Sequence, residues 1–204
     1  YYSVPPFGDG RKHDGWRIGI ASGKDLDTWE KIAELPPLSP CDANGLCAPG
    51  AIVLGKYVHL FYQTYGNGRH DAICHAVSED GVSFAPDESN PVFSPAGEWN
   101  CGRAIDADLI EHEGRLLLYF ATRDPGFKVQ MLGVAAAPLA SKFARHDWAQ
   151  LCERPILKPE LPWEQDCIEA PALCRHDGRL CMFYAGAYNN APQQIGCAVS
   201  DDGL

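Results

Sequence analysis

The sequence predicts an all-β fold of the β-propeller type, with about three to four blades in this chain. Apolar runs of strand character end at Tyr65, Thr122 and Tyr188, and each run follows a short turn. A second apolar segment precedes each turn, and a strand rich in small residues follows each run. This pattern recurs with a period of about 55 to 65 residues, without an amphipathic helix between the units. Repeated four-stranded units that bury their faces against one another are typical of propeller blades.

The repeats divide the chain into four expected blades. Their approximate limits are residues 1–40, 41–95, 96–159 and 160–204. The first blade is partial, because YYSV reads as a second strand and WRIGIASGKDLDTW as a third. Proline-bracketed segments close three blades and suit outer edge strands, where a missing N–H costs no ladder bond. These segments are residues 36–40, 90–95 and 154–159. A β-sandwich is the alternative architecture, but it gives no reason for the same turn and proline closure to recur.

The composition argues against several kinds of partner. The 204 residues include 17 Lys and Arg against 27 Asp and Glu, and this formal net charge of −10 repels phosphate backbones and anionic lipids. We therefore expect no nucleic acid partner and no membrane partner, and the apolar runs are too short to span a bilayer. The sequence lacks nucleotide-binding glycine loops, zinc-binding histidine motifs and a Gly-x-Ser-x-Gly elbow, so no cofactor or metal is predicted.

The cysteines indicate a reducing environment. There are nine, an odd number, and none forms a CxxC pair. Free Cys commonly behaves as a small buried hydrophobe. We therefore expect buried free thiols, which favours a cytoplasmic location. A disulfide framework or a metal site is the alternative.

Two acidic residues occupy similar places in successive repeats. Alignment of the units on their second strands superposes residues 47–49, 106–108 and 169–171, with Asp106 and Glu169 opening the last two. The first strand of a blade lines the central channel, so both acids are expected to face it. Such a pair suits glycoside hydrolysis, in which burial and repulsion keep a proton on one carboxyl and that acid protonates the leaving oxygen. Glu169 has apolar neighbours and suits the acid role, whereas solvated or turn-capping acids are the alternative.

These segments resemble glycoside hydrolase family 43, the five-bladed propeller enzymes that remove arabinofuranose or xylose units. RAIDADLIEHEGRLLLYFA is similar to the family's middle blade, which implies that Asp106 orients the acid and modulates its pKa. Asp108 is a rival for this role, because Ala107 stands where Pro is usual. IEAPALCRHDGRLCMFYAG is similar to the segment that supplies the general acid, here Glu169. The resemblance also implies an inverting mechanism by direct displacement with water.

The same resemblance implies that the general base lies outside these residues. The first strand of the family's first blade carries the base, and the spacing of the other acids puts it about a dozen residues before Tyr1. We therefore expect an incomplete chain that lacks the start of the first blade and the last blade. Such a chain should show little turnover by itself, and its open blade edges would allow self-association.

Six further residues are candidate sugar contacts, because sugar sites combine flat apolar faces with a few fixed polar groups. They are Trp99, Arg103, Arg123, Trp163, Gln63 and Tyr188. Trp99 and Trp163 precede the two acids, with packing between blades as their alternative role. Arg123-Asp124-Pro125 also resembles a tripeptide that stabilises the transition state in invertase-like enzymes, although such a tripeptide is commonly a plain turn.

The leading hypothesis is a glycoside hydrolase that acts on terminal arabinofuranosyl or xylosyl linkages of an oligosaccharide or glycoside. The main alternative is a propeller that binds carbohydrate or another partner without catalysis. A third reading is another propeller enzyme, such as a phosphorylase or a sialidase-like protein. Mutation of Glu169 separates the first two, because only an enzyme would lose turnover.

Overall fold

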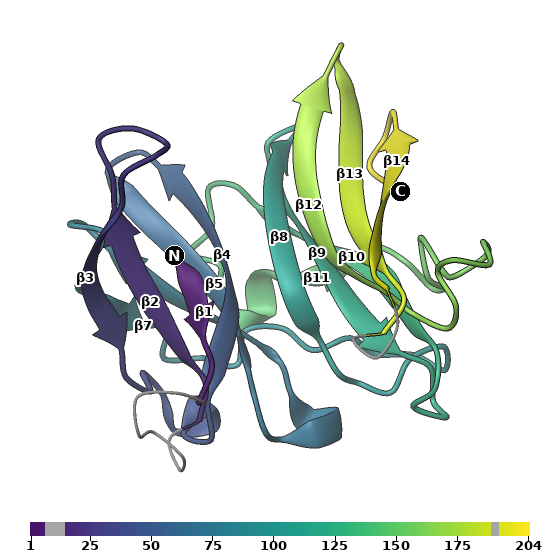
Figure 1. Cartoon of the computed structure of the whole chain (residues 1–204), viewed down its shortest axis with the longest axis horizontal. Coiled ribbons are helices and arrows are strands. Elements are labelled where there is room, and N and C mark those ends of the chain that lie inside the picture. The colour runs from purple at the N-terminus through teal and green to yellow at the C-terminus, as the bar shows by residue number, and fades with distance from the viewer. Residues whose placement is uncertain (7–14, 189–191) are drawn as a thin grey trace.

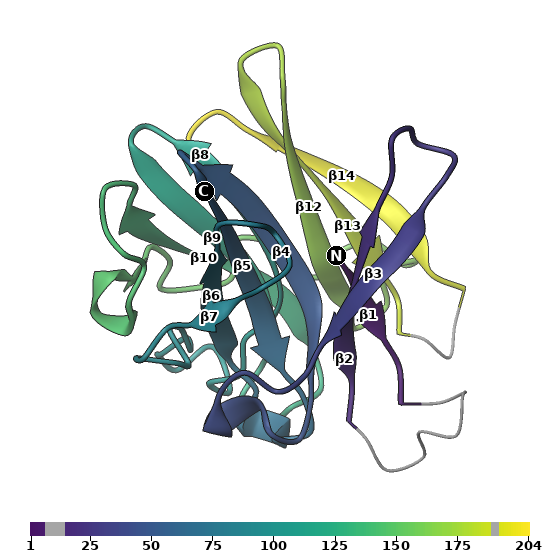
Figure 2. The same cartoon turned by 90° about the vertical axis from the view of Figure 1, so that its left-hand side faces the viewer.

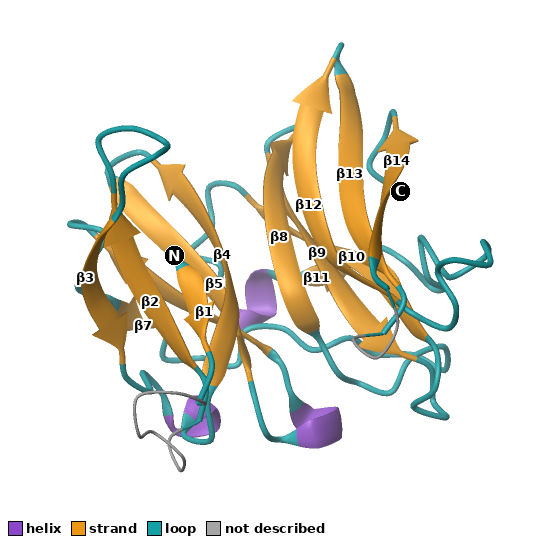
Figure 3. Cartoon of the chain, in the orientation of Figure 1, coloured by secondary structure: helices purple, strands orange, loops and turns teal. Residues whose placement is uncertain are grey.

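The computed structural model describes residues 1–6, 15–188 and 192–204, which form four antiparallel sheets (Figure 1). The strand orders are β1-β2-β3, β4-β5-β6-β7, β8-β9-β10-β11 and β12-β13-β14, so each sheet is a meander. Helical structure in the described residues is limited to three short 3-10 turns (Figure 3). This architecture confirms the predicted all-β fold, a partial propeller.

The strands are short and follow one another in chain order. The first two sheets contain β1 (Tyr2–Val4), β2 (Arg17–Ser22), β3 (Glu30–Leu35), β4 (Leu46–Leu54), β5 (Tyr57–Thr64), β6 (Ile73–Ser78) and β7 (Ala85–Pro86). The last two contain β8 (Ile105–His112), β9 (Arg115–Arg123), β10 (Gln130–Pro138), β11 (Ala149–Gln150), β12 (Ile168–His176), β13 (Arg179–Gly186) and β14 (Gln194–Ser200). The helical turns are η1 (Pro40–Asp42), η2 (Gly68–His70) and η3 (Arg145–Asp147).

A recurring cross-strand pair explains why some strands carry small residues. In three sheets an aromatic ring lies across a glycine of the next strand, and a Cβ atom added there would lie within 2.6 Å of a ring atom. The pairs are Tyr2–Gly19, Phe120–Gly133 and Tyr184–Gly196. Only glycine leaves room for the ring. By this criterion β1 and β2 occupy the places of the second and third strands of the third and fourth sheets. Figure 2 shows β1, β2 and β3 next to one another.

Apolar side chains fill the spaces between successive sheets. Phe61 and Phe120 are fully buried in the cluster between the second and third sheets, and Leu132 and Ile168 are fully buried in the next cluster. Each such side chain contributes about 1.5 to 3 kcal/mol on burial. This packing places β4 against β8 and β8 against β12, so the innermost strands of neighbouring blades lie side by side (Figure 1).

The proline-bracketed segments differ from their predicted role as outer strands. The outer strands are β3, β7 and β11, which precede these segments in the chain. Two of the segments still lie along the outer edge, where Phe93 bridges Ile73 and Leu157 bridges Leu132. Because proline has no backbone N–H, isolated bridges replace a continuous ladder there.

The described residues contain no helix that is both long enough and apolar enough to cross a membrane. The nine cysteines are free thiols, and Sγ of Cys41 lies 3.5 Å from Sγ of Cys74. Within the ranges that the structure describes, His, Cys, Asp and Glu side chains do not gather in groups of three that could hold a metal ion.

Candidate active site

The innermost strands β4, β8 and β12 each carry a bulge near their start. The ladder register skips two residues at each bulge, namely 48–49, 106–107 and 170–171. The first skipped residue has a left-handed backbone, with φ of 47° at Ala48, 51° at Asp106 and 51° at Ala170. This conformation is uncommon for residues other than glycine, and bulges re-aim side chains next to active sites. Equivalent bulges therefore present side chains at the same end of three neighbouring blades.

The bulges correct the alignment expected from the sequence. Asp106 has the backbone position of Ala170, whereas Glu169 has that of Ile105, so the two acids are one residue out of register. The expected alignment assumed that similar side chains occupy equivalent backbone positions. The ladder instead matches Asp108 with Ala172, because each is the first paired residue after its bulge.

Asp106 lies at the bulge of β8 in a partly desolvated environment. Its backbone N–H donates to Oε1 of the buried Gln63 at 2.7 Å. Burial and the nearby Glu169 carboxylate raise the pKa of Asp106 to about 7, and the Arg103 guanidinium opposes the rise. The residue as a whole is only partly buried. A carboxyl with this pKa retains a proton through much of the neutral range.

Glu169 lies directly before the bulge of β12 and is held by two amide side chains. Nε2 of Gln130 donates to its Oε2, and Nε2 of Gln193 donates to its Oε1 at 3.2 Å. Gln130 is buried, and its Oε1 accepts a hydrogen bond from Nε of Arg123 at 3.0 Å. Linked hydrogen bonds of this kind reinforce one another in a low-dielectric setting. They fix the Glu169 carboxylate from β9, from β10 and from the segment before β14.

Two neutral thiols lie close to the acids. Burial, together with Asp106, raises the pKa of Cys47 to about 12. Burial, together with Glu169, raises the pKa of Cys167 to about 12. Thiolates are the reactive and metal-binding form of Cys. These two side chains are therefore uncharged neighbours of the acids and do not act as nucleophiles.

Asp108 is engaged in holding two blades together. Its Oδ2 accepts the backbone N–H of Leu173 at 2.6 Å, which links β8 to β12. Burial raises its pKa. Asp108 also pairs with Tyr119 in the regular ladder beyond the bulge. These contacts favour Asp106 over Asp108 for the predicted orienting role.

Trp99 and Trp163 pack against the protein interior. Trp99 contacts the apolar clusters on both sides of the third sheet, and a Cβ atom on Gly133 would lie 2.9 Å from its ring. Trp163 stacks on Tyr184 with ring centroids 6.0 Å apart and leaves no space for a Cβ atom on Gly186. These contacts favour packing between blades over the sugar-stacking role expected from the sequence.

The other four candidate contacts lie among the groups that surround the acids. Gln63 supports the backbone of the β8 bulge and is buried. Nε of Arg103 lies 3.5 Å from Oδ2 of the buried Asp71. The Arg123 guanidinium carbon lies 5.5 Å from the centroid of the Tyr188 ring. The structure therefore brings these four side chains together with the acids. Gln63 contacts the backbone of the β8 bulge and so supports it.

Asp124 completes a turn. Its Oδ1 accepts the N–H groups of Lys128 and Val129 at 2.6 and 2.8 Å, and its Oδ2 accepts that of Gly126 at 3.2 Å. A carboxylate that accepts several backbone N–H groups is committed to local structure. The plain-turn interpretation of Arg123-Asp124-Pro125 is therefore favoured.

The sequence did not indicate three residues of this site, namely Gln130, Gln193 and Asp71. Gln130 offered a weak signal, because it is a polar residue at the head of an otherwise apolar strand. Gln193 and Asp71 gave none, since their roles depend on contacts with residues about 20 to 30 positions away in the chain.

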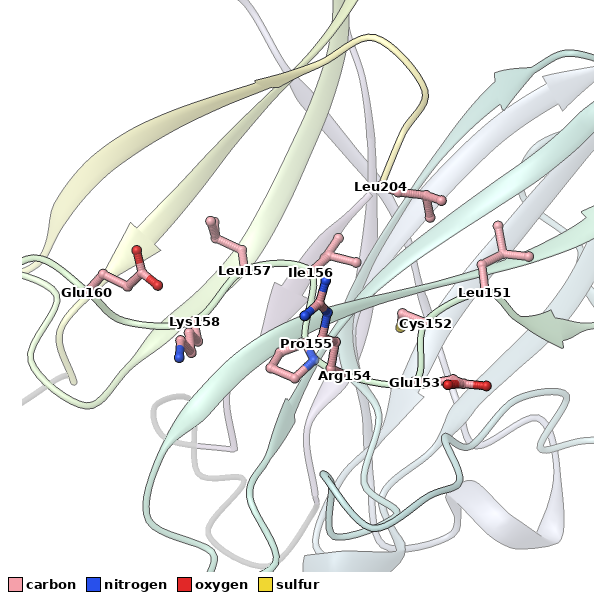
Figure 4. A pocket seen from close by; sticks show the side chains of 10 residues that line it. All are labelled: Leu151, Cys152, Glu153, Arg154, Pro155, Ile156, Leu157, Lys158, Glu160 and Leu204. Carbon is pink, nitrogen blue, oxygen red and sulfur yellow. The ribbon is translucent and has the colours of Figure 1, made fainter.

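A cavity of about 1140 Å³ is lined by other residues (Figure 4). They belong to the segment between β11 and β12 and to Leu204. None of the candidate catalytic or sugar-contacting residues is among them. The candidate site at the bulges therefore rests on its acidic side chains and their contacts. The size of a cavity does not identify it.

Comparison with known proteins identifies the fold. No family model and no curated protein match the chain. A thermostable family-43 glycoside hydrolase is similar with a TM-score of 0.71 and 18% identity, over 94% of this chain and 63% of that one. An endo-1,4-β-xylanase from Bacteroides thetaiotaomicron is similar with a TM-score of 0.68 and 23% identity, over 95% of this chain and 62% of that one. A family-32 β-fructofuranosidase from Bombyx mori is similar with a TM-score of 0.69 and 18% identity, over 93% of this chain and 41% of that one.

The chain spans less than two thirds of the length of each of these three proteins. At such low identity the likeness concerns the backbone. The chain has the fold of the propeller glycoside hydrolases.

Proposed function

We propose that this chain belongs to a glycoside hydrolase of the family-43 type. In this proposal Glu169 is the general acid, and Asp106 orients the acid and modulates its pKa. The observation that carries the proposal is the position of Asp106 at the bulge of β8 and of Glu169 directly before the bulge of β12, on inner strands that lie in contact. Burial and the Glu169 carboxylate together raise the pKa of Asp106 to about 7. The fold of the similar solved structures supports it.

A positioned carboxylic acid supplies the proton that glycoside cleavage needs. Glu169, fixed by Gln130 and Gln193, protonates the glycosidic oxygen as the bond to the anomeric carbon breaks. The neighbouring Asp106, whose pKa burial and Glu169 raise to about 7, orients this acid. Water attacks the opposite face of that carbon and gives its proton to a base. That this base precedes Tyr1 in the chain remains a prediction.

Terminal arabinofuranosyl or xylosyl units are the proposed substrates. The similar solved structures include one named as an α-L-arabinofuranosidase from Lactobacillus brevis and one named as a xylanase, which supports these sugars. The inverting outcome follows from the family resemblance and requires a water molecule between the sugar and the base.

Hydrolysis of aryl α-L-arabinofuranosides and aryl β-D-xylosides tests the proposal, both in the 204-residue chain and in longer polypeptides that contain it. Glu169→Gln and Asp106→Asn should abolish most turnover, whereas Glu111→Gln, an exposed change on the same strand as Asp106, should have no effect. NMR of the first product formed should show the inverted anomer.

Unchanged turnover in Glu169→Gln would show that another group is the acid. Sugar binding without turnover in any of the polypeptides would instead support the non-catalytic carbohydrate-binding alternative.

A further inference from the structure

Three arginines from separate segments meet at one aromatic ring. Arg69 lies in η2, Arg103 precedes β8 and Arg123 ends β9. Their guanidinium carbons lie 4.9, 5.9 and 4.6 Å from the centroid of the Phe127 ring. These distances fall within the range of cation–π attraction. Three cations are thus gathered in a protein whose formal net charge is −10.

The backbone holds Phe127 in a conformation that is unfavourable for a bulky residue. Its φ is 62°, in the left-handed region. Its N–H donates to the carbonyl oxygen of Asp124 at 2.9 Å, and the Asp124 carboxylate closes the same turn. Strain of this kind persists only where the surroundings enforce it, and it is common at ligand-binding sites. The turn therefore keeps the ring in place among the arginines.

Two of the three guanidinium groups lack an anionic partner. Arg103 pairs with a buried carboxylate, as described above. Arg69 donates to the carbonyl oxygen of Pro125 at 3.0 Å, and Arg123 donates to the side-chain oxygen of Gln130, which are both neutral acceptors. Among the described residues neither Arg69 nor Arg123 forms an ion pair. Since a guanidinium carries five N–H donors, each retains most of them for a ligand.

The arginine cluster adjoins the two acids. Arg103 acts electrostatically on Asp106, and Arg123 is bonded to the same Gln130 side chain that holds Glu169. A ligand group bound by the cluster would therefore be part of the sugar chain whose scissile bond lies at the acids.

On the basis of the proposed function, we infer that Arg69 and Arg123 bind an anionic group, a carboxylate or a sulfate ester, on the sugar next to the scissile bond. A guanidinium fork matches the paired oxygens of such a group and forms charge-assisted hydrogen bonds with them. A neutral sugar does not require two unpaired cations at this point. The cluster thus selects charged glycosides over neutral ones.

Calorimetric titration with three small glycosides tests this inference. Methyl β-glucuronide carries the carboxylate, methyl glucoside 6-sulfate carries the sulfate, and methyl β-xyloside is the neutral reference. At low salt at least one charged glycoside should bind about tenfold more tightly than the reference, and Arg69→Gln should remove this preference. Comparison of the two charged ligands distinguishes carboxylate from sulfate.

Arg69→Gln is the informative variant, because Arg69 is exposed and has no bond to the groups that hold the acids. Arg115→Gln is the matched control, since Arg115 is partly exposed at the opposite end of the strand that carries Arg123 and pairs only with the exposed Glu113 among the described residues. It should keep the preference. Equal affinity for charged and neutral glycosides, or an unchanged preference in a folded Arg69→Gln variant, would overturn the inference.

Separate assays distinguish failure of this inference from failure of the proposed function. Arg69-dependent selection of a charged sugar without hydrolysis in any polypeptide would leave the anionic subsite in place and contradict the hydrolase. Hydrolysis of neutral aryl glycosides without any preference for charged sugars would support the hydrolase and contradict the anionic subsite.

Discussion

The bulges of β4 and β8 share a backbone conformation but differ in chemistry. The φ angles of Ala48 and Asp106 are 47° and 51°. The N–H at each bulge is bonded to a polar side chain, Ser3 Oγ at 2.9 Å in one case and Gln63 Oε1 at 2.7 Å in the other. The β4 bulge offers no carboxyl group, whereas the β8 bulge carries one that is coupled to Glu169. The repeated fold thus provides an equivalent bulge in β4, β8 and β12, and single side chains determine which bulge can be chemically active.

Glu169→Gln should have the largest effect, because it makes the β12 bulge as uncharged as that of β4. In a polypeptide that hydrolyses aryl glycosides, we expect turnover to fall about 10³-fold for poor leaving groups. The loss should be smaller for leaving groups that depart without a proton. Measurement of kcat/KM across a series of aryl leaving groups checks this expectation. An equal loss across the series would contradict the acid role.

Gln130→Leu should have the next largest effect. The change removes the donor to Glu169 and the acceptor for Arg123, while the buried volume is largely kept. We expect kcat to fall about tenfold with a smaller change in KM, because the carboxylate loses its fixed orientation. Steady-state kinetics and thermal unfolding of the same sample test this. A folded variant with unaltered kcat would show that Gln130 does not position the acid.

Asp106→Asn should change how stability depends on pH. The pKa of Asp106 is about 7 in the folded protein and about 4 in an unfolded chain. Its contribution to stability is therefore complete below pH 4 and is lost as the pH rises through 7. The uncharged variant should unfold about 5 °C higher than the parent at pH 8.5 and show little difference at pH 4. Thermal unfolding at both pH values measures this, with Glu111→Gln as the control, and an equal difference at both would contradict the raised pKa.

Ala170→Gly should give the smallest effect, a slight stabilisation. Alanine at φ of 51° costs about 1 kcal/mol, and glycine removes this cost but gains entropy in the unfolded chain. We expect a net gain of about 0.5 kcal/mol in the free energy of unfolding. Ala172→Gly, beyond the bulge in the regular ladder, should instead lose about 0.5 kcal/mol. Urea unfolding of both variants makes the comparison, and equal losses would mean that the bulge is not strained.

The repeated fold could be predicted from the sequence, since strand patterns and turns recur at a regular spacing. The same repeats single out Asp106 and Glu169 as candidate acids, and their catalytic roles remain a prediction. The register of the acids could not. A bulge leaves two residues outside the ladder, and no particular residue type reveals where it occurs. Asp106 and Glu169 therefore looked equivalent, although the ladder places them one residue out of register. The roles of Gln130 and Arg69 were also hidden, because both depend on contacts between segments that only the packing of blades brings together.

A carboxyl NMR titration of Asp106 in the parent chain and in Glu169→Gln tests the coupling of the two acids without any need for turnover. If the carboxyl groups share one pocket, Asp106 should titrate with an apparent pKa of about 7 in the parent. Its pKa should be lower in the variant, where burial still raises it but the neighbouring charge is absent. An ordinary aspartate value in the parent, or the same value in both proteins, would show that the two acids do not meet.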